Sequence, residues 1–193
     1  FWLEERDIYC TGNERTGLTW SENTIELYIA GHDAYYTLAI TPDGRCSEMF
    51  FIWKDAYPRG SRYDVPEFDL AVHKPMVFGG DSRPHHERGM RWGFFDWHFP
   101  GLEFAVKVDG TLNQRRDIDR GWQVEIALPW QGLSRLLEGP LPALAGTELS
   151  IACARCQMVE HRATSFAAVW TPHPMPSGGL HIPESYPQWR LVD

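Results

Sequence analysis

The apolar residues of this chain recur mostly at every second position, a spacing typical of β-strands rather than helices. In residues 102–108, for example, apolar and charged residues alternate, and Asp109-Gly110 follows as a hairpin turn signal. Short apolar segments of strand character lie at residues 24–29, 35–40, 47–54, 102–108, 122–128, 149–156 and 166–170. The pattern predicts an all-β fold, an antiparallel β-sandwich.

Helical spacing is confined to short stretches. Residues 130–137 place apolar side chains at Trp130, Leu133, Leu136 and Leu137, which predicts one short helix between Pro129 and Gly139. A second short helix is expected near residues 66–72. The sandwich should therefore carry one or two short helices.

Length and charge limit the classes of partner. The 193 residues, 43% of them hydrophobic, suit one domain spanning 1–193, and no linker divides the chain. The net charge of −8 disfavours nucleic acid and anionic membrane surfaces as partners. No apolar run approaches the 18 residues or so of a membrane span, so no membrane insertion is expected.

Cys153 and Cys156 have the CxxC spacing of redox motifs and half zinc sites. They lie in a segment of strand character, where residues three apart point to opposite faces. Two separate buried thiols are the favoured interpretation.

Several motifs, taken together and in order, resemble the family 9 carbohydrate-binding modules of the wider DOMON-like group. The central motif is Val-Asp-Gly-Thr-Leu-Asn, then Asp-Ile-Asp-Arg-Gly-Trp and Val-Glu-Ile-Ala-Leu-Pro-Trp, at residues 108–113, 117–122 and 124–130. An earlier segment at residues 20–27 and the closing segments at 169–172 and 180–184 also match. The resemblance implies a β-sandwich that binds carbohydrate without turning it over.

The resemblance also implies site residues. Trp20 matches a position that stacks on a sugar ring, and Glu26 one that accepts hydrogen bonds from sugar hydroxyls. The family's second stacking aromatic is replaced by Leu180, and a basic binding residue by Thr37. The alternative is that Trp20 is a core residue at the start of a strand and that Glu26 faces solvent.

Residues 79–100 form a Gly-, Pro- and aromatic-rich stretch that we interpret as a long loop. Trp92 or Trp97 from this loop could supply the missing stacking wall. The alternative is that both anchor the loop on the sandwich. Trp122, Trp130 and Trp170 are expected to be framework residues.

Family members hold structural calcium, and Asp109, Asp117 and Asp119 are the candidates for such a site by resemblance. Alternating aspartates are also typical of ordinary turns. No other cofactor is predicted with certainty.

The resemblance further implies that about two strands are absent ahead of residues 3–7, so a partner domain or chain at the N-terminal edge is expected. An extracytoplasmic location, secreted or periplasmic, follows from the resemblance only.

Two other functions stay open, a haem- or small-molecule-binding DOMON-like module and an interaction domain that has lost its sugar site. An enzyme is not expected, because neither GxSxG nor HExxH occurs.

Overall fold

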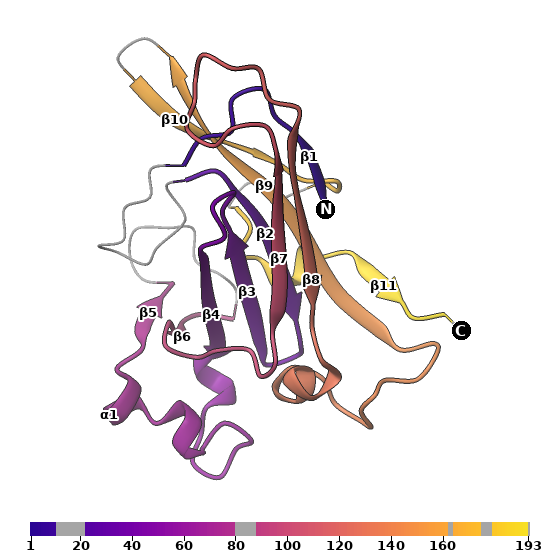
Figure 1. Ribbon diagram of the computed structural model, residues 1–193. Helices are drawn as coiled ribbons and strands as arrows, with labels where there is room; N and C mark the ends of the chain where they lie inside the picture. The colour runs from indigo at the N-terminus through magenta and orange to yellow at the C-terminus, as the bar shows by residue number, and fades with distance from the viewer. Residues whose placement is uncertain (11–21, 80–87, 162–163, 175–178, 193) are drawn as a thin grey trace.

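The computed structural model describes residues 1–10, 22–79, 88–161, 164–174 and 179–192, and the side chains of all of these except residues 160–161 and 164–167. Two β-sheets form two layers, with the smaller sheet packed on one face of the larger one (Figure 1). Every strand pair is antiparallel. The predicted all-β antiparallel sandwich is therefore confirmed.

The three-stranded sheet has the order β1-β8-β7, and the eight-stranded sheet has the order β10-β9-β2-β3-β4-β6-β5, with β11 also paired to β9. The strands are β1 (Trp2–Glu4), β2 (Thr24–Ala30), β3 (Ala34–Ile40), β4 (Cys46–Trp53), β5 (Met76–Phe78), β6 (Arg91–Phe94), β7 (Glu103–Asp109), β8 (Gly121–Ala127), β9 (Glu148–His161), β10 (Thr164–Trp170) and β11 (Gln188–Arg190).

Helical structure is short, as predicted. Asp69 caps the single described α-helix, α1 (Leu70–His73), by accepting hydrogen bonds from the backbone of Ala71 and Val72. The predicted helix at 130–137 is instead a 3-10 helix, Trp130–Arg135. A side chain at Gly132 would meet the Phe99 ring at 2.0 Å, so this segment lies close against the sandwich. No helix in the described residues is long and apolar enough to cross a membrane.

The inner face of the eight-stranded sheet forms the main core with the smaller sheet. Alternate residues of β2 and β3 point inward, including Leu27 and Leu38, and meet Trp122 and Val124 of β8. Trp122 is therefore a framework residue, as predicted, and Trp130 packs partly buried on the same core. Trp170 is not a framework residue, contrary to the prediction, because the residue is 51% exposed on β10.

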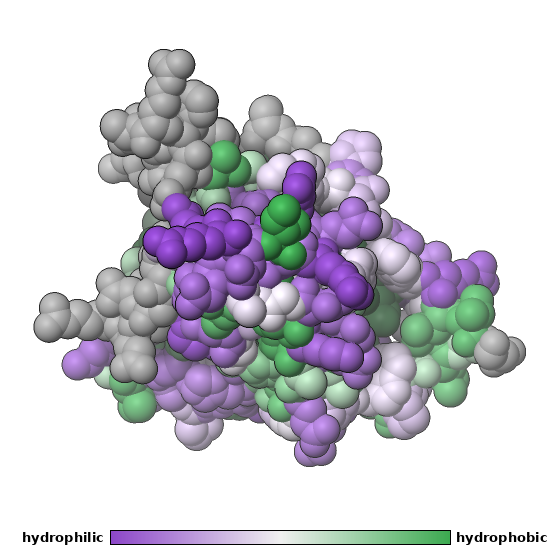
Figure 2. All heavy atoms as spheres, turned by 45° about the horizontal axis from the view of Figure 1, so that its top comes forward, coloured by the Kyte–Doolittle hydropathy of each residue, from purple (hydrophilic) through white to green (hydrophobic). Residues whose placement is uncertain are grey.

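The outer face of the eight-stranded sheet carries a second buried cluster. It contains aromatic residues from β2, β3 and β4, and it is covered by Leu180 and Tyr186 from the C-terminal segment. The outer face is therefore enclosed by its own chain over this region. In contrast, the described surface seen in Figure 2 is mostly hydrophilic, with hydrophobic residues scattered across it.

Candidate functional site

The register of the sheet brings the polar residues of β2, β3 and β9 together on the outer face. Tyr28 lies directly opposite Thr37, and Thr24 lies opposite Cys156. Residues two apart on a strand, and residues directly opposite on neighbouring strands, share a face. Glu26, between Thr24 and Tyr28, therefore lies in the same group. We call Thr24, Glu26, Tyr28, Thr37 and Cys156 the polar cluster.

Glu26 is a buried carboxylate, with 8% of the residue exposed. The Tyr28 hydroxyl donates to its Oε2, and the Thr24 hydroxyl donates to its Oε1 over 3.2 Å. Within the described residues, Glu26 forms no ion pair. Its partners directly across the sheet are Ala39 and Ala154, whose short side chains bring neither a charge nor a hydrogen-bonding group to the carboxylate. A buried carboxylate without a cation is costly, and hydroxyl donors reduce that cost only in part.

Thr37 adds a second unsatisfied polar group. The residue is 4% exposed, and its hydroxyl oxygen has no hydrogen-bond partner in the described part of the chain. A buried hydroxyl without a partner costs about 1–3 kcal/mol. Such groups are rare in folded proteins, so this one is a candidate contact for a polar ligand.

The donors around Glu26 keep their protons at neutral pH. Burial raises the pKa of the Cys156 thiol, and the charge of Glu26 raises it further. Burial and the same carboxylate also raise the pKa of Tyr28 well above its usual value. The cluster therefore presents one carboxylate with neutral donors, a combination that suits hydrogen bonding rather than nucleophilic chemistry.

Beside the polar cluster, the outer face is aromatic. Tyr35 stacks on Phe51 with ring centroids 4.5 Å apart. The Arg91 guanidinium lies 5.0 Å from the ring of Trp53, and His181 hydrogen-bonds the Tyr35 hydroxyl at 3.1 Å. We call Tyr35, Phe51, Trp53, Arg91 and His181 the aromatic cluster.

Three of the positions singled out by the family resemblance meet on this outer face. Glu26 and Thr37 belong to the polar cluster, and Leu180 packs against the neighbouring aromatic residues. The Leu180 carbonyl accepts a 2.6 Å hydrogen bond from the Tyr186 hydroxyl, which holds the C-terminal segment over the sheet. Trp20, the predicted stacking residue, lies outside the described residues.

Trp92 and Trp97 lie on the other side of the sheet, so we do not include them in the candidate site. Trp97 is 5% exposed in the main core, and its indole N–H donates to Glu67 over 2.6 Å. Trp92 lies opposite Ile52 of β4 and packs partly buried against the same core. The segment predicted as one long loop contains β6, and the register of β6 against β4 turns Trp92 inward.

The three aspartates proposed for calcium have partners in their own hairpin and in the N-terminal segment. Asp119 accepts hydrogen bonds from the backbone N–H groups of Ile8 and Thr111, at 2.8 and 2.7 Å. Asp117 accepts from the Thr111 hydroxyl, and Asp109 pairs with Arg120 at 3.5 Å. No group of three or more His, Cys, Asp or Glu side chains that could hold a metal occurs among the described residues. Calcium binding at these aspartates stays a prediction by resemblance.

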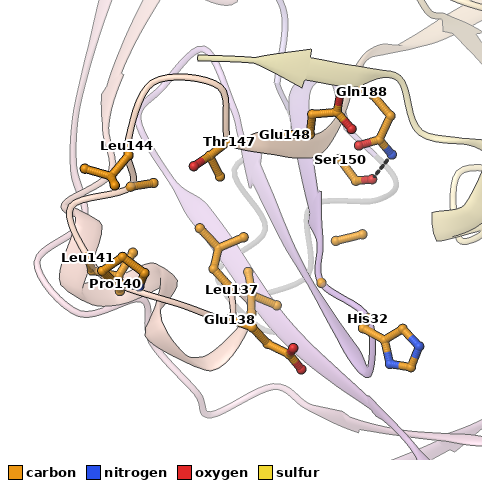
Figure 3. Close-up of a pocket in the computed structure, with 14 residues that line it drawn as sticks. His32, Leu137, Glu138, Pro140, Leu141, Leu144, Thr147, Glu148, Ser150 and Gln188 are labelled. Atoms are coloured by element: carbon orange, nitrogen blue, oxygen red, sulfur yellow. Dashed lines mark hydrogen bonds between the residues drawn. The ribbon is translucent and has the colours of Figure 1, made fainter. Parts of the chain in front are cut away.

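A separate cavity of about 450 Å³ lies at the end of the sandwich formed by the β2–β3 turn, the segment 136–144, β9 and β11 (Figure 3). Its lining is mixed: apolar residues of the segment 136–144 form one part, and polar side chains such as Thr147, Glu148 and Gln188 form another. The His32 side chain is 81% exposed and the Glu138 side chain 75% exposed, so both side chains face water. None of the polar cluster lines this cavity, and we do not place the site here.

Sequence reasoning singled out Glu26 but missed Thr24, Tyr28 and Cys156. Thr24 and Tyr28 lie two positions before and after Glu26, so the strand period could have found them. Cys156 required the β2–β9 register, which the sequence does not give.

Comparisons with known proteins are sparse. No family model matches the chain, and no curated protein matches it. Among solved structures it is similar to a crystal structure of a "putative carbohydrate-binding protein" from Bacteroides uniformis. The identity is 12%, the TM-score is 0.49, and the match covers 98% of this chain and 68% of that one. The function proposed below rests on the residues of this chain.

Proposed function

We propose that the protein is a non-catalytic carbohydrate-binding domain, and that the polar cluster on the outer face of the eight-stranded sheet is part of its sugar site. The observation that carries the proposal is Glu26, a buried carboxylate with hydroxyl donors and no cation among the described residues.

The acceptor capacity of Glu26 suits a polyol. A carboxylate has about four lone-pair sites, and two hydroxyl bonds and a hydrogen bond with the Cys156 thiol engage Glu26. The remaining capacity can accept a hydrogen bond from a sugar hydroxyl, and such charge-assisted bonds are the strong ones. Thr37, with its unpartnered hydroxyl, adds a donor and acceptor on the neighbouring strand.

A non-catalytic role agrees with the protonation of the cluster. The raised pKa values of Cys156 and Tyr28 disfavour their anions, so neither side chain is an activated nucleophile. We extend the proposal to Trp20 as the stacking wall, on the family resemblance alone.

The test is a binding screen against monosaccharides and cello-, xylo-, manno- and galacto-oligosaccharides, followed by calorimetric titration and intrinsic fluorescence. Glu26→Gln keeps the shape of the side chain and removes its charge, so we expect at least tenfold weaker binding. The matched control is Glu125→Gln, because Glu125 is an exposed carboxylate on β8 of the other sheet.

Two outcomes would contradict the proposal: wild-type protein that binds no sugar of the panel, or Glu26→Gln protein that binds as tightly as Glu125→Gln protein. If binding needs Glu26 but Trp20→Ala binds equally well, the function stands and the stacking assignment is wrong.

A further inference from the structure

The inner face of the eight-stranded sheet is unevenly covered. Toward β4 and β6 it is covered by core residues of connecting segments, among them Tyr63, Phe68 and Phe99. Toward β9, β10 and β11 it extends past the three-stranded sheet, whose last strand on this side is β1 (Figure 1). The overhang leaves a groove of about 470 Å³ between β1 and β9.

The groove is apolar and aromatic. Trp2 from β1, Trp170 from β10 and Trp189 from β11 line it and are each 51–54% exposed. Cys153 and Ile25 line it as well. Leu3 points into the core opposite Trp122, so the neighbouring Trp2 points away from it and contributes its backbone to the groove. The two half-exposed indoles of Trp170 and Trp189 on the inner face are unusual for a surface that only faces water.

One wall of the groove is a free strand edge. Phe1 and Val124 exchange two backbone hydrogen bonds, at 2.7 and 3.0 Å, and the Glu5 N–H donates to the Arg120 carbonyl. In an antiparallel pair these residues face the partner strand, so Trp2 and Glu4 direct their backbone groups the other way. Arg155 donates to the Glu4 carbonyl over 2.9 Å. The remaining edge groups are the N–H and C=O of Trp2 and the N–H of Glu4.

We propose that this groove is a docking site for an extended polypeptide strand from a partner chain, with apolar side chains at alternate positions. The strand would pair with the free edge of β1 and place every second side chain against Trp170, Trp189 and Cys153. This is the β-augmentation mode, in which backbone bonds give affinity and pockets for alternate residues give specificity.

The polar groups of the groove favour a strand over a sugar. The Arg155 guanidinium already donates to the Glu4 carbonyl and to Gln157, and the Thr171 hydroxyl donates to the His173 carbonyl. Backbone groups of β1 are therefore the free hydrogen-bonding partners that the described residues offer here. Half-exposed indoles that line a groove, such as Trp170 and Trp189, are typical of protein–protein contact surfaces. We therefore assign the strand to a separate polypeptide.

The probe is a capped heptapeptide, Lys-Thr-Val-Thr-Val-Thr-Lys, titrated against the whole protein with tryptophan fluorescence as the readout. We expect saturable one-to-one binding and slower amide exchange at Trp2 and Glu4. A scan of single N-methyl substitutions along the peptide should alternate, with at least tenfold loss at every second position, because alternate amides face β1. Trp170→Ala and Trp189→Ala should each weaken binding at least tenfold, whereas Val72→Ala, an exposed control, should not.

The proposal is overturned if the peptide does not bind at millimolar concentration, or if N-methylation has equal effect at every position. It is also overturned if an oligosaccharide binds instead and loses affinity in Trp170→Ala.

Discussion

The polar cluster and the aromatic cluster share one face of one sheet and are both largely buried, yet they differ in how their atoms are satisfied. In the aromatic cluster, Tyr35 and Phe51 stack and are 0% exposed. In the polar cluster, Thr37 is buried with an unpartnered hydroxyl and Glu26 without a countercharge in the described residues. The buried Arg91 Nε of the aromatic cluster is unpartnered as well, but its guanidinium lies over the aromatic rings, whereas Glu26 has hydroxyl donors and no cation in the described residues. Burial therefore does not separate a packing surface from a binding surface, but a buried carboxylate without a countercharge does.

The physical reason lies in the residues across the sheet. Phe51 lies opposite Tyr35 and Gly93, so large rings fill the space above the strands. Glu26 lies opposite Ala39 and Ala154, so no large side chain lies directly across the sheet from it. Variants of the two clusters are therefore expected to change stability and binding in different proportions.

The largest effect is expected in the aromatic cluster. Phe51→Ala removes a fully buried ring that contacts Tyr35, Phe78 and His181. The cavity and lost contacts should lower the free energy of unfolding by about 3–5 kcal/mol. Urea denaturation followed by circular dichroism measures this. A loss below about 1 kcal/mol would show that the ring is not part of a packed cluster.

Tyr28→Phe should have the next largest effect. It removes the hydroxyl that donates to Glu26, and hydrogen bonds to charged groups contribute about 1.5–3 kcal/mol. The matched control is Tyr186→Phe, whose hydroxyl donates to the neutral Leu180 carbonyl and should cost about 0.5–1.5 kcal/mol. Equal losses in the two variants would mean that the Glu26 carboxylate does not depend on Tyr28.

Thr37→Val should stabilise the protein by about 1 kcal/mol, because it replaces an unpartnered buried hydroxyl with a methyl group of similar shape. The same variant should weaken sugar binding. Thr41→Val is the control: the buried Thr41 hydroxyl donates to Asp43 over 2.5 Å, so its removal should destabilise. Thermal unfolding of the two variants beside the wild type measures both changes in stability. Destabilisation by Thr37→Val would indicate a partner for that hydroxyl.

The smallest effect concerns thiol reactivity. In a background with Cys10, Cys46 and Cys153 replaced by serine, iodoacetamide should label Cys156 slowly at pH 8, because burial raises the thiol pKa. Removing the nearby negative charge with Glu26→Gln lowers that pKa, so labelling should become severalfold faster. Mass spectrometry gives the rates. An unchanged labelling rate would show that the charge of Glu26 does not influence the Cys156 thiol.

The strand pattern was predictable from the sequence because period two is a local signal. Residues 35–40 and 47–54 fall within one residue of β3 and β4. The packing of Trp92 and Trp97 in the main core was not predictable, because it depends on the register in which β6 pairs with β4. A shift of one residue would turn Trp92 to the outer face.

The candidate site was predictable only along a single strand. Glu26 came from the family resemblance, and its position between Thr24 and Tyr28 is local. The alanines opposite it and the proximity of Cys156 depend on long-range pairing of β2 with β3 and β9, which composition and spacing do not encode. The half-exposed Trp170 was predicted wrongly for the same reason: its surroundings belong to β1 and β11.

The two proposed sites lie on opposite faces of the eight-stranded sheet, and this has a practical consequence for measuring binding. Cys153 lines the groove from the inner face, whereas Glu26 lies on the outer face of the neighbouring strand. A ligand on one face leaves the other face uncovered, so both ligands should occupy one molecule at the same time. Sugar and strand binding can therefore be titrated independently, each with the other ligand at saturation, without any substitution.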